Sequence, residues 1–168
     1  MKKVILGLGS NRNYNGLTSL QILSKACASL SEILSFITLS SVYISKPMYY
    51  EKQDNFYNMA LSGFLDDAIL PEVLLEKIHL IEKEFGRNRE KEIRNGPRSL
   101  DIDIEYIEGL SLNTENLKIP HPKIKERAFV LVPVLEILDK TADEKLMEEF
   151  SSYLQNLPDA KDLVKIWF

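Results

Sequence analysis

The segment from Ser99 to Ile107 constrains the fold of this chain most, because its side chains alternate strictly between two kinds. One set of positions holds Leu100, Ile102, Ile104 and Tyr106, and the other holds Ser99, Asp101, Asp103 and Glu105. Successive side chains of a strand point to opposite faces of a sheet, so this alternation is typical of a strand. We therefore expect a half-buried strand with an acidic outer face.

Other segments show the periodicity of strands or helices. Apolar runs over residues 4–9 and 56–64 predict strands, as does a β-branched and aromatic run over 36–43. Apolar residues at helical spacing predict helices over 17–34 and 71–85. With the strand at 99–107, the order is β-α-β-β-α-β. This order predicts an α+β fold with a ferredoxin-like core, in which two helices pack on one face of an antiparallel sheet.

The remaining residues elaborate this core. We expect an extended turn over 117–122, an apolar stretch over 128–138 that is broken by Pro133, a helix over 145–154 and a last strand over 163–168. We find no repeat and no linker, and 168 residues suit one domain. We therefore expect a single domain spanning residues 1–168.

Charge and cysteine content narrow the class of protein. The formal net charge is −4, which argues against a nucleic-acid binder. The single cysteine, Cys27, cannot form an intramolecular disulfide, and this is typical of the reducing cytoplasm. No apolar run approaches the ~18 residues of a membrane span. We expect a cytoplasmic monomer that binds small molecules, with neither nucleic acid nor membrane as a partner.

The segment 86–98 is basic in an otherwise acidic chain. It contains two acidic residues, Glu90 and Glu92, and five basic ones, namely Arg87, Arg89, Lys91, Arg94 and Arg98. Such a cluster suggests a site for an anionic small molecule. A solvated, charged loop is the alternative on composition alone.

Asp101 and Asp103 are the strongest candidates for chemistry. They stand two residues apart on the expected strand, so their carboxylates share a face and repel each other. Mg²⁺ offsets such repulsion, and two ions held by two carboxylates suit the transfer of a phosphorus group. Arg98 precedes the strand in Gly96-Pro97-Arg98 and can hold phosphate oxygens. The alternative is an ordinary solvated strand face.

Two histidines and their neighbours are weaker candidates. His79 and Glu82 stand three apart and are expected to share a helix face. His121 lies between two prolines that fix its backbone, which suits a positioned donor, and Arg127 follows six residues later. The alternative interpretation for each histidine is an ordinary surface residue without a functional role.

The glycines near the N-terminus match a dinucleotide-binding loop only in part. In Gly7-Leu8-Gly9-Ser10-Asn11-Arg12, an arginine stands where the third glycine of that motif belongs. No acidic residue follows at the required spacing of about 20 residues. We reject the dinucleotide-binding interpretation and expect these glycines to allow close packing between strand and loop.

Together these motifs resemble the 6-hydroxymethyl-7,8-dihydropterin pyrophosphokinase family of folate biosynthesis. The similarity runs from Leu6-Gly7-Leu8-Gly9-Ser10-Asn11 to Phe129-Val130-Leu131-Val132-Pro133. Its most specific part is Gly96-Pro97-Arg98 with Asp101 and Asp103. Shorter matching pieces are Ser41-Val42-Tyr43 with Pro47, Phe56-Tyr57-Asn58, Ile81-Glu82, Gly86-Arg87 with Arg89, Asn113-Thr114-Glu115, Pro120-His121 and Arg127-Ala128-Phe129.

The resemblance implies a ferredoxin-like α+β fold and a diphosphokinase that moves the β,γ-diphosphoryl unit of ATP to the pterin hydroxymethyl oxygen, releasing AMP. It implies that Asp101 and Asp103 bind two Mg²⁺ ions and that Arg87 and Arg98 hold phosphate and stabilise the transition state. The residues implied to contact ATP also include His79, Glu82, Arg89, His121 and Arg127. Those implied to contact the pterin are Ser45, Pro47, Met48, Phe56, Asn58 and Phe129.

Two other functions remain as alternatives. One is another two-metal, nucleotide-dependent transferase on a ferredoxin-like core, although template-binding enzymes of that kind need broad basic surfaces. The other is a non-catalytic ligand-binding module, which has no need for an aspartate pair beside several arginines. Mg²⁺-dependent ATP binding that is lost in Asp101→Ala would separate an enzyme from a module.

Overall fold

A computed structural model describes residues 1–48, 51–88, 92–93 and 96–166 of the chain. Its main sheet has the strand order β5-β1-β4-β3-β8, and β2 also pairs with β4. The strands are β1 (Lys2–Ser10), β2 (Ser35–Leu39), β3 (Val42–Ser45), β4 (Phe56–Leu65), β5 (Asp101–Ile107) and β8 (Val164–Ile166). Every pairing in this sheet is antiparallel. The predicted α+β, ferredoxin-like class is confirmed.

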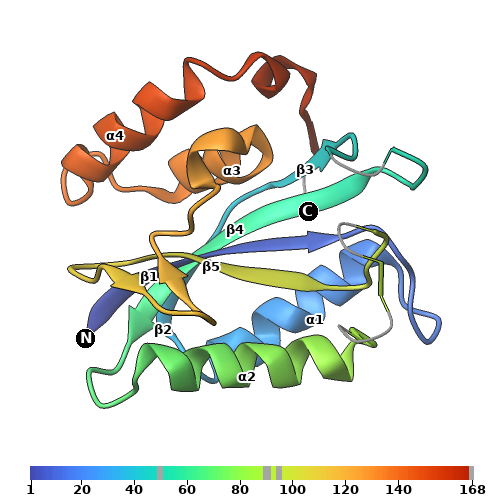
Figure 1. The fold of residues 1–168 in the computed structure, drawn as a ribbon, viewed down its shortest axis with the longest axis horizontal. Coiled ribbons are helices and arrows are strands. Elements are labelled where there is room, and N and C mark those ends of the chain that lie inside the picture. Colours follow the sequence, from blue (N-terminus) through green and yellow to red (C-terminus); the bar gives the residue numbers. More distant parts are fainter. Residues whose placement is uncertain (49–50, 89–91, 94–95, 167–168) are drawn as a thin grey trace.

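Helices cover both faces of the sheet (Figure 1). On one face lie α1 (Ser19–Ser31) and α2 (Pro71–Glu84), as the element order predicts. On the other lie α3 (Ala128–Ile137) and α4 (Glu144–Leu154), which belong to the C-terminal elaboration. Within the described parts of the chain, no helix is long and apolar enough to cross a membrane.

The helices α1 and α2 each begin at a residue that favours the start of a helix. Thr18 caps α1, because its hydroxyl accepts the backbone N–H of Gln21 while the Gln21 side chain accepts the N–H of Thr18. Pro71 opens α2, where its missing N–H costs no hydrogen bond. Leu17 and Leu34, which the helical spacing includes, lie outside α1.

The strand predicted over 36–43 is in fact two strands, β2 and β3. Ser40 lies between them, and its hydroxyl accepts the backbone N–H of Ala60 at 2.8 Å. Its own backbone N–H donates to the carbonyl of Ala60 at 3.0 Å. A side-chain oxygen thus takes a position in the ladder that a backbone carbonyl would otherwise hold, and the strand is interrupted there.

The alternation expected over 99–107 fails at Glu105. The pairing between β1 and β5 shifts there, since Ile5 faces Tyr106 while Leu6 faces Ile104. Because of this bulge, Tyr106 lies on the face of the sheet that α3 and α4 cover, where its ring meets Phe150 edge-on. Tyr106 therefore does not share a face with Ile104. Glu105 is fully buried rather than part of an exposed acidic face, and Ser99 is buried too.

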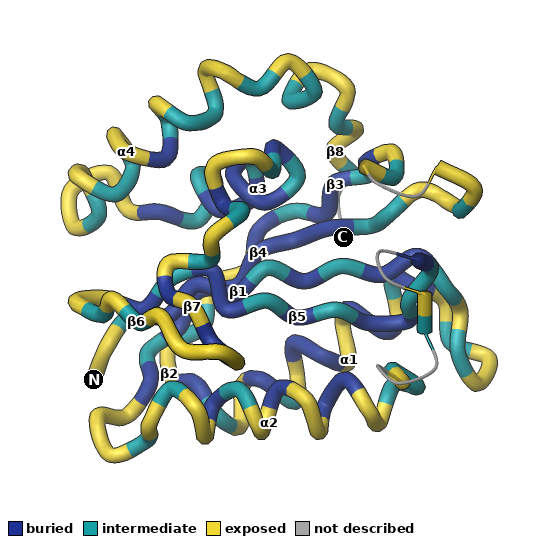
Figure 2. The backbone as a smooth tube through the Cα atoms, in the orientation of Figure 1, coloured by how far each residue is buried: buried dark blue, intermediate teal, exposed yellow. Residues whose placement is uncertain are grey.

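The second layer has its own small core, centred on Phe150 and Leu131. Figure 2 shows α3 buried between the sheet and α4, whose outer side is exposed. Contrary to the expected break, α3 runs through Pro133. The predicted last strand is confirmed as β8, which pairs with β3, although residues 167–168 lie outside the described part of the chain.

Smaller elements complete the chain. The predicted extended turn contains β7 (Lys118–Ile119), which pairs with β6 (Leu112–Asn113). A cis peptide bond joins Ile119 to Pro120. Short 3-10 helices follow at Ile124–Glu126 and Pro158–Asp162.

Candidate active site

A pocket opens between the sheet and the start of α3. Its walls come from β1, β3, β4, β5 and α3 and from the loops beside them. Its lining includes nine of the side chains singled out in the sequence: Ser45, Met48, Phe56, Asn58, Arg98, Asp101, Asp103, Arg127 and Phe129. These residues are up to 84 positions apart in the chain, and the antiparallel sheet brings them together.

Each aspartate of the pair is held by an arginine. Asp101 Oδ2 lies 2.6 Å from Arg98 Nη1, and Asp101 Oδ1 lies 3.3 Å from Arg87 Nη2. Asp103 Oδ2 accepts a hydrogen bond from Arg127 Nη1 at 3.0 Å. The guanidinium groups offset the repulsion between two carboxylates on the same strand face. The same groups can bind an anion that arrives with its own cation.

The aspartate pair has the chemistry of a hard-cation site. Its side chains keep 22% and 32% of their surface exposed, so their oxygens are accessible from the pocket. Two carboxylates fit Mg²⁺, which uses one or two protein carboxylates and completes its shell with water and phosphate oxygens. Among the residues that the structure describes, no group of three or more His, Cys, Asp or Glu could hold a metal ion.

Asn11 fixes the approach of Arg98 to the pair. Its side-chain oxygen accepts the backbone N–H of Arg98 at 2.8 Å, and its backbone N–H donates to the Arg98 carbonyl at 3.0 Å. Its amide nitrogen donates to the side chain of Gln53 and to the carbonyl of Asp54. Asn11 therefore joins the start of β5 to the loop before β4. Our sequence reasoning did not assign it this role.

Other residues of the pocket suit a flat, polar ring. Asn58 is buried, and its amide nitrogen donates to the Ser45 hydroxyl at 2.8 Å. Phe56 and Phe129 supply aromatic faces, each with an arginine within 6 Å of its ring centre: Arg98 at 5.9 Å and Arg127 at 5.8 Å. Aromatic faces and an amide edge are the groups that recognise a heterocycle with donors and acceptors on its rim.

Glu105 is a pocket residue that the sequence reasoning placed on an exposed face. Its two carboxyl oxygens are buried and have no hydrogen-bond partner among the described residues. Burial raises the pKa of Glu105 well above its ordinary range, and the charge of Asp103 adds to this effect. The signal in the sequence was Gly7, because only a residue without a side chain leaves room beside Glu105 on the neighbouring strand.

His121 stands close to Glu105. Its Nδ1 accepts the backbone N–H of Lys123 at 3.2 Å and lies 3.8 Å from Glu105 Oε2. Burial lowers the pKa of His121, and the nearby charge of Arg127 lowers it further, although Asp103 opposes both. A neutral ring that accepts at Nδ1 carries its proton on Nε2, which is then a donor.

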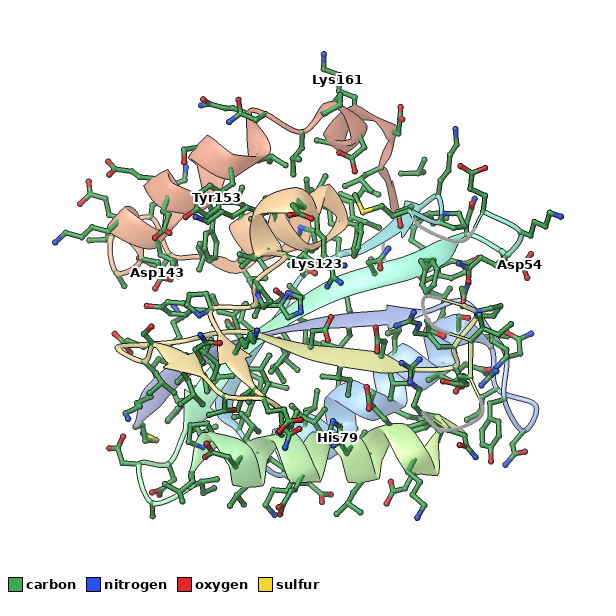
Figure 3. All side chains as sticks on the ribbon, viewed as in Figure 1. Asp54, His79, Lys123, Asp143, Tyr153 and Lys161 are labelled. Carbon is green, nitrogen blue, oxygen red and sulfur yellow. The ribbon has the colours of Figure 1, made fainter. Side chains whose placement is uncertain are left out.

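Several predicted residues are not part of the pocket lining. His79 and Glu82 do not share an environment: His79 is exposed on α2, whereas Glu82 is buried and accepts the backbone N–H of Ile102 at 2.9 Å. Figure 3 shows His79 on α2, well away from Asp54 in the loop before β4. Pro47 is half-buried beside the pocket. Arg89 lies outside the described residues.

Comparisons with known proteins show the family of this chain. A family model described as 7,8-dihydro-6-hydroxymethylpterin-pyrophosphokinase (HPPK) matches residues 5–139. The 2-amino-4-hydroxy-6-hydroxymethyldihydropteridine pyrophosphokinase of Aquifex aeolicus is 39% identical over 137 residues, which cover 82% of this chain and 81% of that protein. A Bacillus subtilis protein of the same name is 40% identical over 111 residues, 66% of this chain and 64% of its own length.

Some relatives are much longer. Folic acid synthesis protein FOL1 of Dictyostelium discoideum is 38% identical over 167 residues, so this chain spans 24% of its length. A crystal structure of Plasmodium falciparum HPPK-DHPS matches with a TM-score of 0.63 at 17% identity, over 100% of this chain and 48% of that chain. That likeness supports the fold alone. The family model and the Aquifex relative show that the chain belongs to the 7,8-dihydro-6-hydroxymethylpterin-pyrophosphokinase family.

Proposed function

We propose that this chain transfers diphosphate from ATP to the hydroxymethyl group of 6-hydroxymethyl-7,8-dihydropterin in folate biosynthesis. The products are AMP and the pterin diphosphate. The observation that carries the proposal is one pocket that is lined both by an arginine-held aspartate pair and by Asn58 with the aromatic rings of Phe56 and Phe129. The names of its relatives support the same reaction.

The reaction needs positioning and neutralisation of charge more than covalent chemistry. The pterin oxygen attacks the β-phosphorus, the bond from that phosphorus to the oxygen bridging to the α-phosphate breaks, AMP leaves with that oxygen, and the hydroxyl proton passes to water. Asp101 and Asp103 would hold two Mg²⁺ ions, which when bound neutralise the charge of the phosphates. Arg87 and Arg98 then leave the Asp101 carboxylate and hold the transferring group.

The remaining site residues divide between the two substrates. For ATP we propose Arg127, which donates to Asp103, and His121, which stands beside Glu105, together with His79, Glu82 and Arg89 on the resemblance alone. For the pterin we propose Asn58 and the residues around it, namely Ser45, Pro47, Met48, Phe56 and Phe129. Buried donors of fixed geometry are the usual means of recognising such a ring.

The setting of the reaction is also part of the proposal. We propose that residues 1–168 form one pyrophosphokinase domain that acts as a cytoplasmic monomer without nucleic acid. The net charge of −4 supports the absence of nucleic acid as a partner, and the free thiol of Cys27 supports the reducing cytoplasm. Light scattering after size-exclusion chromatography should give the mass of one chain, and a dimer mass would contradict the monomer.

The test is product analysis. The protein is mixed with ATP, Mg²⁺ and 6-hydroxymethyl-7,8-dihydropterin, and the nucleotide product is identified by chromatography. We expect AMP with a diphosphorylated pterin, and loss of both in Asp101→Ala with folding intact. Formation of ADP would mean single phosphoryl transfer and contradict the proposal. ATP binding without turnover would point to a non-catalytic module.

A further inference from the structure

A chain of ion pairs runs from the loop after β1 to the aspartate pair. Arg12 Nη2 lies 2.7 Å from Glu92 Oε1, and Glu92 Oε2 lies 3.1 Å from Arg87 Nε. Arg87 continues to Asp101, which lines the pocket. The Glu92 carboxylate is therefore held between two guanidinium groups at the border of the proposed active site.

This arrangement has the features of an anion site. The side chains of Glu92 and Arg87 are each 11% exposed, and that of Arg12 is 40% exposed. Guanidinium groups present planar sets of donors that fit carboxylate and phosphate oxygens alike. Arg12 donates to one oxygen of Glu92, and Arg87 forms an ion pair with the other without hydrogen-bond geometry. Two guanidinium groups that face both oxygens of one carboxylate can also face two oxygens of a phosphate.

The backbone around the two arginines is closely packed. Gly86 ends α2 with a φ of +85°, and a Cβ atom there would stand 2.3 Å from the ring of Tyr14. The tyrosine can pack against this turn only because residue 86 is glycine. Arg12 Nη2 also lies 3.5 Å from the Gly86 carbonyl oxygen. The loop that carries Arg12 is therefore held against the turn that carries Arg87.

We propose that Arg12 and Arg87 form an anion-binding pair for the polyphosphate of the nucleotide, and that Glu92 occupies this pair when no substrate is bound. The inference rests on the proposed function, because it names a subsite for the same substrate. Arg12 is the residue that excluded the dinucleotide motif, and this subsite gives it a role. Glu92 belongs to the same chain, so it competes at a high effective concentration. The phosphate must displace it, and the apparent affinity for nucleotide is lower as a result.

The experiment measures binding by calorimetry with Mg²⁺ present. The probes are inorganic tripolyphosphate and an ATP analogue with a methylene group between the α- and β-phosphorus, which cannot be cleaved there. The variants are Glu92→Gln, Arg12→Met and the double variant. The control is Glu84→Gln, which removes the same charge from the exposed end of α2. Thermal unfolding confirms that each variant is folded.

We expect Glu92→Gln to bind both probes about threefold to tenfold more tightly than the control. Arg12→Met should weaken binding, and the loss should be larger in the Glu92→Gln background, where Arg12 no longer has a carboxylate partner. Unchanged or weaker binding in Glu92→Gln would overturn the inference, because a purely structural Glu92 behaves in that way.

The same experiment separates this inference from the proposed function. If the wild-type protein binds the ATP analogue but forms no AMP, the proposed function is contradicted. In that case, tighter binding of the analogue by Glu92→Gln would still support the arginine pair. A wild-type protein that forms AMP, with Glu92→Gln unchanged in affinity, contradicts only the arginine pair. A wild-type protein that binds neither probe contradicts both.

Discussion

The Oε1 atom of Glu105 lies 3.0 Å from the point where a Cβ atom would stand at Gly7. The two residues belong to neighbouring strands, β5 and β1, beside the bulge in their pairing. Gly7 thus leaves the space that a buried carboxyl group fills, next to the aspartate pair. A buried polar group without a hydrogen-bond partner lowers stability, so this relationship affects the free energy of folding as well as the pocket.

The first prediction concerns the space at Gly7. Gly7→Ala should lower the free energy of unfolding by about 1–3 kcal/mol, because the added methyl group overpacks against Glu105. Urea denaturation followed by circular dichroism measures this loss. In a Glu105→Ala background the same substitution should cost much less, since the carboxyl group is gone. An equal loss in both backgrounds would show that some other neighbour resists the methyl group.

The second prediction concerns the carboxyl group itself. Glu105→Met should raise the free energy of unfolding by about 1–3 kcal/mol, because an apolar side chain of similar length replaces an unpartnered buried polar one. The comparison is Glu115→Met, at an exposed position, which should change stability by less than about 0.5 kcal/mol. Chemical denaturation at pH 7 measures both variants. A destabilised Glu105→Met would mean that the carboxyl group has a partner in solution.

The third prediction separates the two substrates. Asn58→Ala removes the amide that donates to the Ser45 hydroxyl, on β4, which β1 separates from the aspartates on β5. We expect KM for the pterin to rise about tenfold or more, because a lost polar contact with substrate leaves buried groups unpaired. KM for ATP should change little. Steady-state kinetics with each substrate varied in turn checks this, and equal changes in both KM values would argue against the assignment.

The fourth prediction concerns acid stability. The Glu136 carboxylate is partly buried, which raises its pKa, but hydrogen bonds from Ser41, Lys165 and Tyr43 lower that pKa more. A depressed folded-state pKa contributes stability above the unfolded value of about 4.3, and this contribution disappears as pH falls through the folded value. Glu136→Gln should therefore be less stable than wild type at pH 7, with a difference that shrinks below about pH 4. Urea denaturation across this range tests the trend, and a constant difference would contradict it.

The fifth prediction concerns the single thiol. Cys27 is buried in α1, and burial raises its pKa to about 11. Because the thiolate is the reactive form, Cys27 should not react with a thiol-specific colorimetric reagent at pH 8 in the folded protein. It should react fully in denaturant, which serves as the control. Rapid reaction of the folded protein would show that α1 opens readily.

The order of the main elements could be predicted because each carries enough apolar residues to show its period. The aspartate pair could be predicted for the same reason, since positions two apart on a strand share a face. Interruptions within an element could not be predicted from this period. Nothing in the composition of 36–43 shows that the Ser40 hydroxyl would enter the ladder, and alternation alone cannot reveal the bulge at Glu105.

Contacts between distant segments were the other limit. Residue type marked Arg98 as an anion ligand, and the family resemblance marked Arg127, but neither showed that each arginine would hold a different aspartate. Asn11 looked like part of a glycine-rich turn, and only its bonds to Arg98 and Asp54 reveal a positioning residue. Such contacts depend on the register of β1, β4 and β5, which periodicity does not specify.

The proline inside α3 has a consequence for the aromatic wall of the pocket. Pro133 has no N–H, so the carbonyl of Phe129, four residues earlier, lacks the hydrogen bond that a regular helix would supply. Phe129 itself packs against the core around Phe150 and lines the pocket. The aromatic wall of the pocket therefore stands on a turn of α3 that is held by side-chain packing rather than by this backbone hydrogen bond.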